Sequence, residues 1–500
     1  MSQPARGNEA TSTNAHNRDL RRGAIGVTGI LFFVLSAQAP LTGIGGALPL
    51  AVSMGNGAGV PAAYLVVGAI IAIFAVGYIA MSRHLTAGGA FHTYIGRALG
   101  PGLGTGSALL ALWAYNTMQA CMYGLYGATT SALAETYLHL TAPWWAWSAA
   151  TMLLVQLLGS LDIDLGARFL AVLVAAEMAI LLAFALTTLI TGGGPEGLAP
   201  AASFSPAALL SGAPGVALTF AIASMFGFES TAIYAAEAKD PARTVPRATY
   251  LAVSVIALFF AFVSWMVVSS HGPSHIADQA GRALRSGDST ALVFSAVAHT
   301  LGGWAATTAG VLMATSLLAG ILAFHNASNR YLHSLGRAAA MPPLLARTTR
   351  RGAPFVASGL QTALALVLVL PFAALGLDPV LTLFSWGNGV AILGLLVLYF
   401  LTSVSVVVFF QRTRLETRPW HSRIAPALAA VLIAGLATLV LTNFDLLTGG
   451  APSTATPLVL TVPAVLLTGT ALGSRRGNDQ AATPTATSTT SGPDPQLPDA

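Results

Sequence analysis

Two carboxyl groups are the side chains best placed for chemistry in this 500-residue sequence, because each interrupts a long apolar run. Of the 18 acidic residues, Glu177 and Glu229 are the two near the middle of such runs. Burial disfavours the charged form of a carboxyl, so that the group can exchange a proton nearer neutral pH. Both residues are therefore candidates for coupling to a cation, H+ or Na+. The alternative is structural: each carboxyl binds polar groups of neighbouring helices.

Two apolar runs contain residues that interrupt a helix. In the run near residues 25–50, Pro40 removes a backbone donor and clashes with the preceding turn. In the run near residues 213–238, Gly227 stands beside Glu229. Backbone N–H groups freed at a break hold carboxylates, and freed carbonyls hold cations. The substrate-binding candidates at the two breaks are Ser36, Ala37, Gln38, Ala39, Phe226, Gly227 and Phe228.

Each candidate also has a structural interpretation. Proline and glycine are common in membrane helices for other reasons, and the two phenylalanines either cover a substrate or only pack. In the run near residues 103–134, three polar residues lie on one face or adjacent to it. They either line the pocket or form interhelical hydrogen bonds, and they are Tyr115, Asn116 and Gln119.

The composition excludes most soluble and nucleic-acid-binding proteins. Hydrophobic residues make up 55% of the chain and charged residues 8%, whereas soluble domains carry roughly 25% charged residues. The net charge of +5 does not indicate nucleic-acid binding, because the basic residues lie in short segments between apolar runs. The single cysteine excludes an intramolecular disulfide and a cysteine-based metal cluster.

Long apolar runs separated by short polar segments predict an all-α polytopic membrane protein. A membrane-spanning helix needs about 20 apolar residues. Twelve runs are predicted to span, near residues 25–50, 60–82, 103–134, 143–160, 166–191, 213–238, 246–270, 304–334, 354–375, 378–411, 423–443 and 456–473.

The basic residues predict the orientation of these spans, since Lys and Arg accumulate in cytoplasmic segments. With the N-terminus in the cytoplasm, all 23 Lys and Arg residues except Arg282 and Arg285 fall on the cytoplasmic side. We therefore predict a protein of the cytoplasmic (inner) membrane with both termini in the cytoplasm. Residues 1–22 and 474–500 are polar and are predicted to be disordered.

The two interrupted runs lie five helices apart, which is typical of inverted-repeat transporters. The prediction is a 5+5 inverted repeat within a transmembrane domain of residues 23–473. The first repeat covers about residues 25–191 and the second about 213–411, with interrupted helices 1 and 6. Two further helices follow within residues 423–473.

Several motifs resemble the amino acid–polyamine–organocation (APC) permease family. The sixth run ends in GFES at residues 227–230, and the loop after it reads KDPARTVPRA at residues 239–248. Pro241 is expected to end the sixth helix and Pro246 to lie in the first turn of the seventh. Supporting motifs are GY at 77–78, AGGAF at 87–91, HN at 325–326 and RY at 330–331. The similarity covers about residues 23–440.

The resemblance implies secondary transport of an amino acid, polyamine or similar amine. The sequence departs from the family at two places. Gln38 stands within AQAP at residues 37–40, where many members carry a run like GSG. The fifth helix carries Glu177 and no lysine, so the lysine-based mechanism of some proton-coupled members cannot be transferred.

The predicted function is ion-coupled symport of such a small molecule across the lipid bilayer, with exchange as the alternative. An integral-membrane enzyme is a less favoured interpretation, because no cluster of His, Asp or Ser lies at one membrane face. A channel would be expected to show repeated pore loops, and a receptor an extra soluble domain. The sequence shows neither pattern, so both interpretations are less favoured. No cofactor is predicted apart from H+ or Na+ as the coupling ion.

Overall fold

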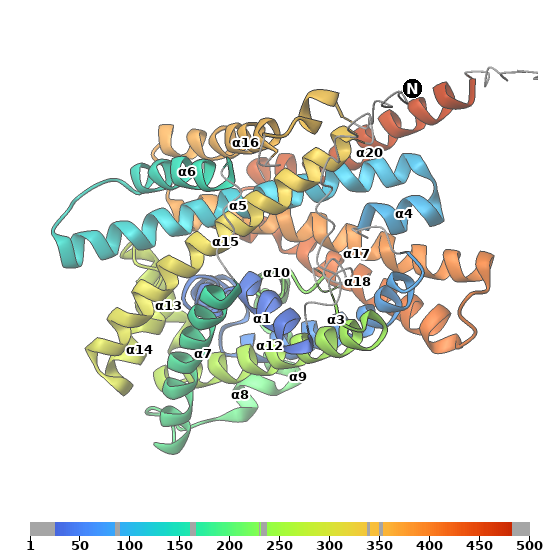
Figure 1. Ribbon diagram of the computed structural model, residues 1–500. Coiled ribbons are helices and arrows are strands. Elements are labelled where there is room, and N and C mark those ends of the chain that lie inside the picture. Colours follow the sequence, from blue (N-terminus) through green and yellow to red (C-terminus); the bar gives the residue numbers. More distant parts are fainter. Residues whose placement is uncertain are drawn as a thin grey trace, which may run out of the picture.

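The computed structural model describes residues 26–85, 91–160, 167–229, 231, 238–337, 341–349 and 354–482. Within these residues the chain is built of helices, turns and loops, with one isolated bridge between Gly194 and Gly197. Figure 1 shows the helices packed around a centre that contains α1 and α10.

The α-helices cover much of the predicted apolar runs, and six shorter ones, α4, α8, α9, α13, α14 and α19, lie between those runs. They are α1 (Val27–Gln38), α2 (Leu48–Leu50), α3 (Val60–Ser82), α4 (Phe91–Leu99), α5 (Pro101–Leu138), α6 (Trp144–Ser160), α7 (Ala167–Ile190), α8 (Pro200–Phe204), α9 (Pro206–Leu209), α10 (Pro214–Ala223), α12 (Pro241–His271), α13 (Ile276–Arg285), α14 (Ala291–Leu301), α15 (Gly303–Arg337), α16 (Phe355–Ala374), α17 (Ser385–Thr413), α18 (Ala425–Thr442), α19 (Phe444–Leu447) and α20 (Pro452–Ala482). Four short segments are π-helices: η1 (Thr42–Ala47), η2 (Ala51–Asn56), η6 (Pro379–Phe384) and η7 (Trp420–Ile424). Two are 3-10 helices: η3 (Gly57–Gly59) and η5 (Pro343–Ala346).

Eight helical segments within the described residues are long and apolar enough to cross a membrane. The chain is therefore a multi-pass membrane protein by the length and composition of its helices. One of the eight, Thr42–Ser82, joins parts of two predicted spans, because only a kink at Gly55 separates them. The twelve-helix count and the inverted repeat remain predictions.

Three boundaries differ from the sequence-based expectation. The helical segment after the first break continues to Asn56, beyond the predicted end at residue 50. Pro241 is the first residue of α12 instead of the end of the preceding helix, and Pro246 lies inside α12. Pro246 has no N–H to bond the carbonyl of Ala242. That carbonyl instead accepts a hydrogen bond from Arg83, at 3.4 Å.

The last helix is also longer than predicted. α20 continues to Ala482, whereas the predicted span ends at residue 473. The residues after Gly473 are helix-compatible until Pro484, and the residue before a proline disfavours helical backbone. The rest of the predicted C-terminal tail, residues 483–500, lies outside the described residues, as does the predicted N-terminal segment 1–22.

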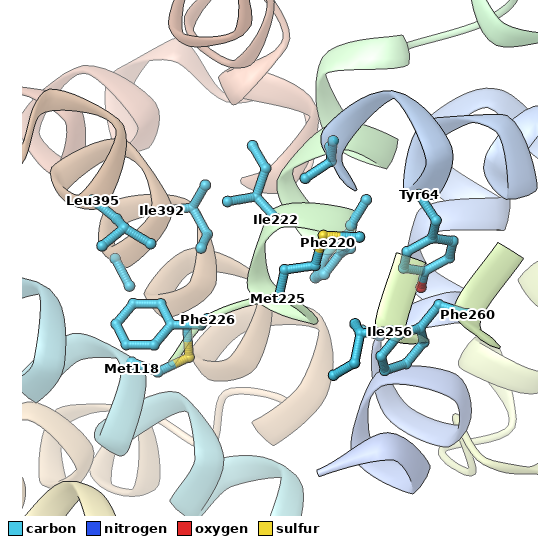
Figure 2. Packing of buried hydrophobic residues seen from close by; sticks show 14 of the residues in the cluster. Tyr64, Met118, Phe220, Ile222, Met225, Phe226, Ile256, Phe260, Ile392 and Leu395 are labelled. Carbon is cyan, nitrogen blue, oxygen red and sulfur yellow. The ribbon is translucent and has the colours of Figure 1, made fainter. Parts of the chain in front are cut away.

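Packing between helices places the two interrupted segments at the centre. α1 contacts α7, α12 and α15, while α10 contacts η1, α3 and α17. The rings of Tyr64 and Phe260 stack with centroids 5.2 Å apart, as Figure 2 shows. Gly43 lies so close to the Phe260 ring that a Cβ at this position would clash with it. The small residues near the first break therefore allow close approach to α12.

The predicted topology can be tested by labelling engineered cysteines from outside intact cells. The native Cys121 is buried and should give little background. Asp278 and Lys239 are both exposed. We expect modification of an Asp278→Cys variant and protection of a Lys239→Cys variant, because the basic residues predict that these positions face opposite sides. The reverse labelling pattern would show that the orientation is wrong.

Candidate functional site

The first break follows the last residue of α1. Ala39 adopts a left-handed conformation with φ 43° and ψ 77°, which costs about 1–2 kcal/mol for a residue with a Cβ. The carbonyl of Ala39 accepts hydrogen bonds from the N–H groups of Thr42 and Gly43, at 2.9 and 3.1 Å. The helical segment after the break therefore begins with its first amides already bonded.

Glu177 on α7 binds this break directly. Its Oε2 accepts a hydrogen bond from the Leu41 N–H at 3.1 Å. Ser316 of α15 lies beside the same carboxyl. Glu177 is fully buried, and its Oε1 makes no hydrogen bond to any residue that the structure describes. Oε2 therefore has a structural role at the break.

The second break follows α10. Residues 224–229 form turns, and Gly227 has φ 105°, a conformation that favours glycine. The Gly227 N–H donates to Oε2 of Glu229 at 3.1 Å. Tyr399 of α17 donates to the same oxygen at 3.3 Å, and Tyr78 of α3 donates to the Glu229 carbonyl at 3.1 Å. Glu229 thus ties its own break to two neighbouring helices.

A pocket lies between the two breaks. Gln38 closes one side, because its Nε2 donates to the Met225 carbonyl at 3.3 Å and so joins α1 to the segment after α10. Figure 2 shows Phe226 beside Met118 at this position. The lining residues are Gln38, Ala39, Thr42, Gly43, Ala47, Met118, Met122, Ala223, Ser224, Phe226, Phe324, Phe384 and Asn388.

Three lining side chains carry oxygen atoms that have no partner. They are Oε1 of Gln38, Oγ1 of Thr42 and Oδ1 of Asn388, all buried and without a hydrogen bond to another described residue. A buried acceptor without a partner is unfavourable by about 1–3 kcal/mol. A ligand that brings hydrogen-bond donors into the pocket would remove this penalty.

An aromatic cluster adjoins the pocket. The ring of Phe226 lies 5.3 Å from that of Phe324 and 5.5 Å from that of Tyr115, measured between centroids. Phe226 and Phe324 line the pocket, and Tyr115 packs behind them on α5. Such contacts stabilise a fixed arrangement of the rings, and they give the pocket an apolar wall.

The structure brings only some of the sequence-predicted residues to the pocket. Gln38, Ala39 and Phe226 line the pocket, and Tyr115 contacts its wall. The backbone of Ser36 and Ala37 lies in the last turn of α1. The remaining candidates are not lining residues: Asn116, Gln119, Gly227 and Phe228.

The candidates outside the lining, and the buried His325, form contacts within or between helices. Gln119 donates to the Ile321 carbonyl at 3.0 Å and accepts from Gln361 at 2.7 Å, joining α5, α15 and α16. Asn116 donates to the Leu112 carbonyl of its own helix at 2.8 Å. His325, fully buried, contacts Ser358 at 2.9 Å between α15 and α16. Phe228 packs against Phe74 and Tyr399.

Ten lining residues were not among the predicted site residues: Thr42, Gly43, Ala47, Met118, Met122, Ala223, Ser224, Phe324, Phe384 and Asn388. The methionines follow Tyr115 at helical spacing on α5, so the face proposed for that helix contained the signal. Asn388 is a polar residue inside the apolar run near 378–411. An uncharged amide in such a run is a weak signal, because it is equally typical of an interhelical hydrogen bond.

Comparison with known proteins agrees with this architecture. Residues 25–470 match the amino acid permease family. Over 305 residues the chain is 25% identical to histidine permease HisP of Lactococcus lactis subsp. cremoris (strain MG1363), a match covering 59% of this chain and 62% of that relative. The chain thus matches less than two thirds of that relative's length.

A solved structure shares the fold. It is the Eremococcus coleocola manganese transporter in complex with an aromatic bis-isothiourea substituted compound, with a TM-score of 0.53 and 14% identity. The similarity covers 90% of this chain and 95% of that protein. The apolar helices and the family match together define a multi-pass membrane protein. The chain belongs to the amino acid permease family.

Proposed function

We propose that this protein is a secondary active transporter that moves an amino acid or related amine by alternating access. The observation that carries the proposal is the position of the pocket between the two interrupted segments, joined by the hydrogen bond from Gln38 to Met225. Discontinuous helices are the usual place for substrate and ion sites in inverted-repeat transporters. The family match and the resemblance to a histidine permease support a nitrogen-containing substrate.

We propose proton-coupled symport with Glu177 as the coupling residue. The support is its full burial and its unpartnered Oε1, next to a break that contributes to the pocket. Protonation would change the charge beside Leu41, whose N–H is the group that Oε2 now binds. Glu229 is a weaker candidate for coupling than Glu177, because its Oε2 accepts hydrogen bonds from both Gly227 and Tyr399 and so has a structural role. An exchanger without net coupling is the second mode of transport that this pocket could serve.

For the number of spans, their topology and the membrane, we propose what the sequence predicts. The distribution of basic residues supports twelve spans with both termini in the cytoplasm, and the two interrupted segments support the 5+5 inverted repeat. Manganese, named for the structural neighbour, is not the proposed substrate. The described lining residues include no Asp or Glu, and so lack the carboxylates that suit Mn²⁺.

Transport by the purified protein in proteoliposomes tests this proposal. We expect at least one member of a panel of labelled amino acids and amines to accumulate under an inward H+ gradient, and a protonophore to abolish the accumulation. Accumulation driven only by Na+ would replace the proton as coupling ion. Uptake that requires unlabelled substrate inside the vesicle would identify exchange. A folded protein that moves no member of the panel under any of these conditions would contradict the proposed function.

A further inference from the structure

The pocket offers unpartnered acceptors, while the backbone donors around it are already bonded. We propose that it selects the ammonium group of a monoamine with an apolar body over the zwitterion of an amino acid. The inference rests on the proposed function, because it names the substrate class of the same pocket.

The acceptors come from three elements that converge on the pocket. Gln38 is 5% exposed and Asn388 is 1% exposed, and Thr42 is half-buried. The orientation of the Gln38 amide is fixed, since its Nε2 must face the Met225 carbonyl. Oε1 is therefore the end of the amide that is left without a partner. The Thr42 hydroxyl and the Asn388 amide can also donate, whereas Oε1 of Gln38 only accepts. An ammonium group has three donors and no acceptor, and all three of these oxygens can accept from it.

The donors that would hold a carboxylate are used by the protein itself. In the first turn after Ala39, Pro40 has no N–H, Leu41 donates to Glu177, and Thr42 and Gly43 donate to the Ala39 carbonyl. At the second break, Gly227 donates to Glu229. A substrate carboxylate would have to displace these bonds. Glu177 thus already occupies the Leu41 N–H at the start of the helical segment after the break.

Two further lining donors are bonded in the same way. The N–H of Ser224 donates to the Phe220 carbonyl and that of Phe226 to the Ala223 carbonyl, both at 3.1 Å. The backbone on both sides of the pocket therefore offers an anion none of these N–H groups, and the donors that remain are the Thr42 hydroxyl and the Asn388 amide. The unpartnered oxygens favour a cation that donates hydrogen bonds.

The other lining groups determine which kind of ligand fits beside the ammonium group. Phe226, Phe324 and Phe384 present aromatic rings, which attract an ammonium group electrostatically and pack against apolar atoms. Met118 and Met122 add flexible apolar surface. Among the residues that the structure describes, the lining contains no acidic side chain that would hold a second ammonium group, so these residues disfavour a diamine or polyamine.

Calorimetric titration of the purified full-length protein with matched ligand pairs tests the inference. Phenethylamine and phenylalanine differ by one carboxylate, as do histamine and histidine, and 3-phenylpropionate has the carboxylate alone. We expect each amine to bind at least about tenfold more tightly than its amino acid, and 3-phenylpropionate not to bind. A smaller preference in either pair, or no binding of any probe, would overturn the inference. Coupled uptake of amino acids would then still support the proposed function.

A variant at Asn388 tests whether this pocket is the one responsible. Asn388→Leu keeps the branching of the side chain but removes its polar atoms, and we expect it to weaken amine binding by about tenfold or more. Gln411→Leu, on the same helix and exposed, is the matched control and should bind as the parent does. Both proteins must elute as folded monodisperse species. Unchanged amine affinity in a folded Asn388→Leu variant would contradict the assignment. If that variant does not fold, Asn388→Ser, which retains a hydroxyl acceptor, should bind more weakly than the parent, and equal binding would overturn the assignment.

Discussion

Glu177→Gln is expected to abolish accumulation driven by a pH gradient while substrate binding and counterflow persist. The amide oxygen of glutamine can still accept the hydrogen bond that Leu41 now donates at 3.1 Å, so the break in helix 1 keeps its partner. The amide cannot take up a proton, so the energy of the gradient is no longer transmitted. At zero membrane potential, one pH unit corresponds to about 1.4 kcal/mol, or tenfold accumulation for one coupled proton. In the variant, the internal substrate concentration should rise only to about the external concentration.

Two control variants separate coupling from stability. Glu135→Gln changes an exposed carboxyl on α5 and should accumulate substrate as the parent does. Glu177→Leu removes the acceptor and leaves a buried N–H without its bond, which should destabilise the fold by about 1–3 kcal/mol. If Glu177 were only structural, Glu177→Gln would retain gradient-driven accumulation and show at most reduced thermal stability. That result, or transport by the parent that depends on Na+ and not on pH, would remove Glu177 from the coupling mechanism.

Ala223→Phe should eliminate substrate binding by filling the pocket. Ala223 is the last residue of α10, lines the pocket and is half-buried, so a larger side chain has room to enter the space that the ligand needs. Overpacking costs about 1–3 kcal/mol of stability, which a membrane protein of this size can tolerate. We expect a loss of affinity of at least about 100-fold, equivalent to 2.7 kcal/mol, measured by calorimetry on detergent-purified protein.

The matched control for this variant is Ala434→Phe on α18. Ala434 is exposed and faces away from the protein interior, so the same added volume should leave binding and stability close to those of the parent. Size-exclusion chromatography with fluorescence detection establishes that both variants are folded. If folded Ala223→Phe bound substrate with the affinity of the parent, the substrate site would lie elsewhere in the molecule.

The breaks were predictable because their signals are local. Pro40 restricts the backbone and Gly227 permits a positive φ wherever the helices pack, and non-helical conformations occur next to Pro40 and at Gly227 itself. The importance of Glu177 and Glu229 was also visible, since a carboxyl in an apolar run requires a partner. The identity of each partner was not visible. Glu177 bonds to Leu41, which is 136 residues away, and only the packing of α7 against α1 brings them together.

The side chains that line the pocket depended on helix rotation. Tyr115 and Gln119 are one turn apart on the same general face of α5, yet Tyr115 contacts Phe226 whereas Gln119 bonds to Ile321 and Gln361. A rotation of a few tens of degrees would exchange these environments, and sequence periodicity does not define an angle that finely.

The sequence by itself determined that this is a helical membrane protein, where most of its helices lie, and where two of them are interrupted. These properties follow from composition and from backbone restrictions, which act within a few residues. Tertiary structure decided which acceptors are left unpartnered in the pocket, because Asn388 and Gln38 come from helices far apart in the sequence. It also decided that the protein's own carboxylates occupy the amides of Leu41 and Gly227. Hydrogen bonds between distant segments depend on how all the helices pack together, and no local pattern encodes that arrangement.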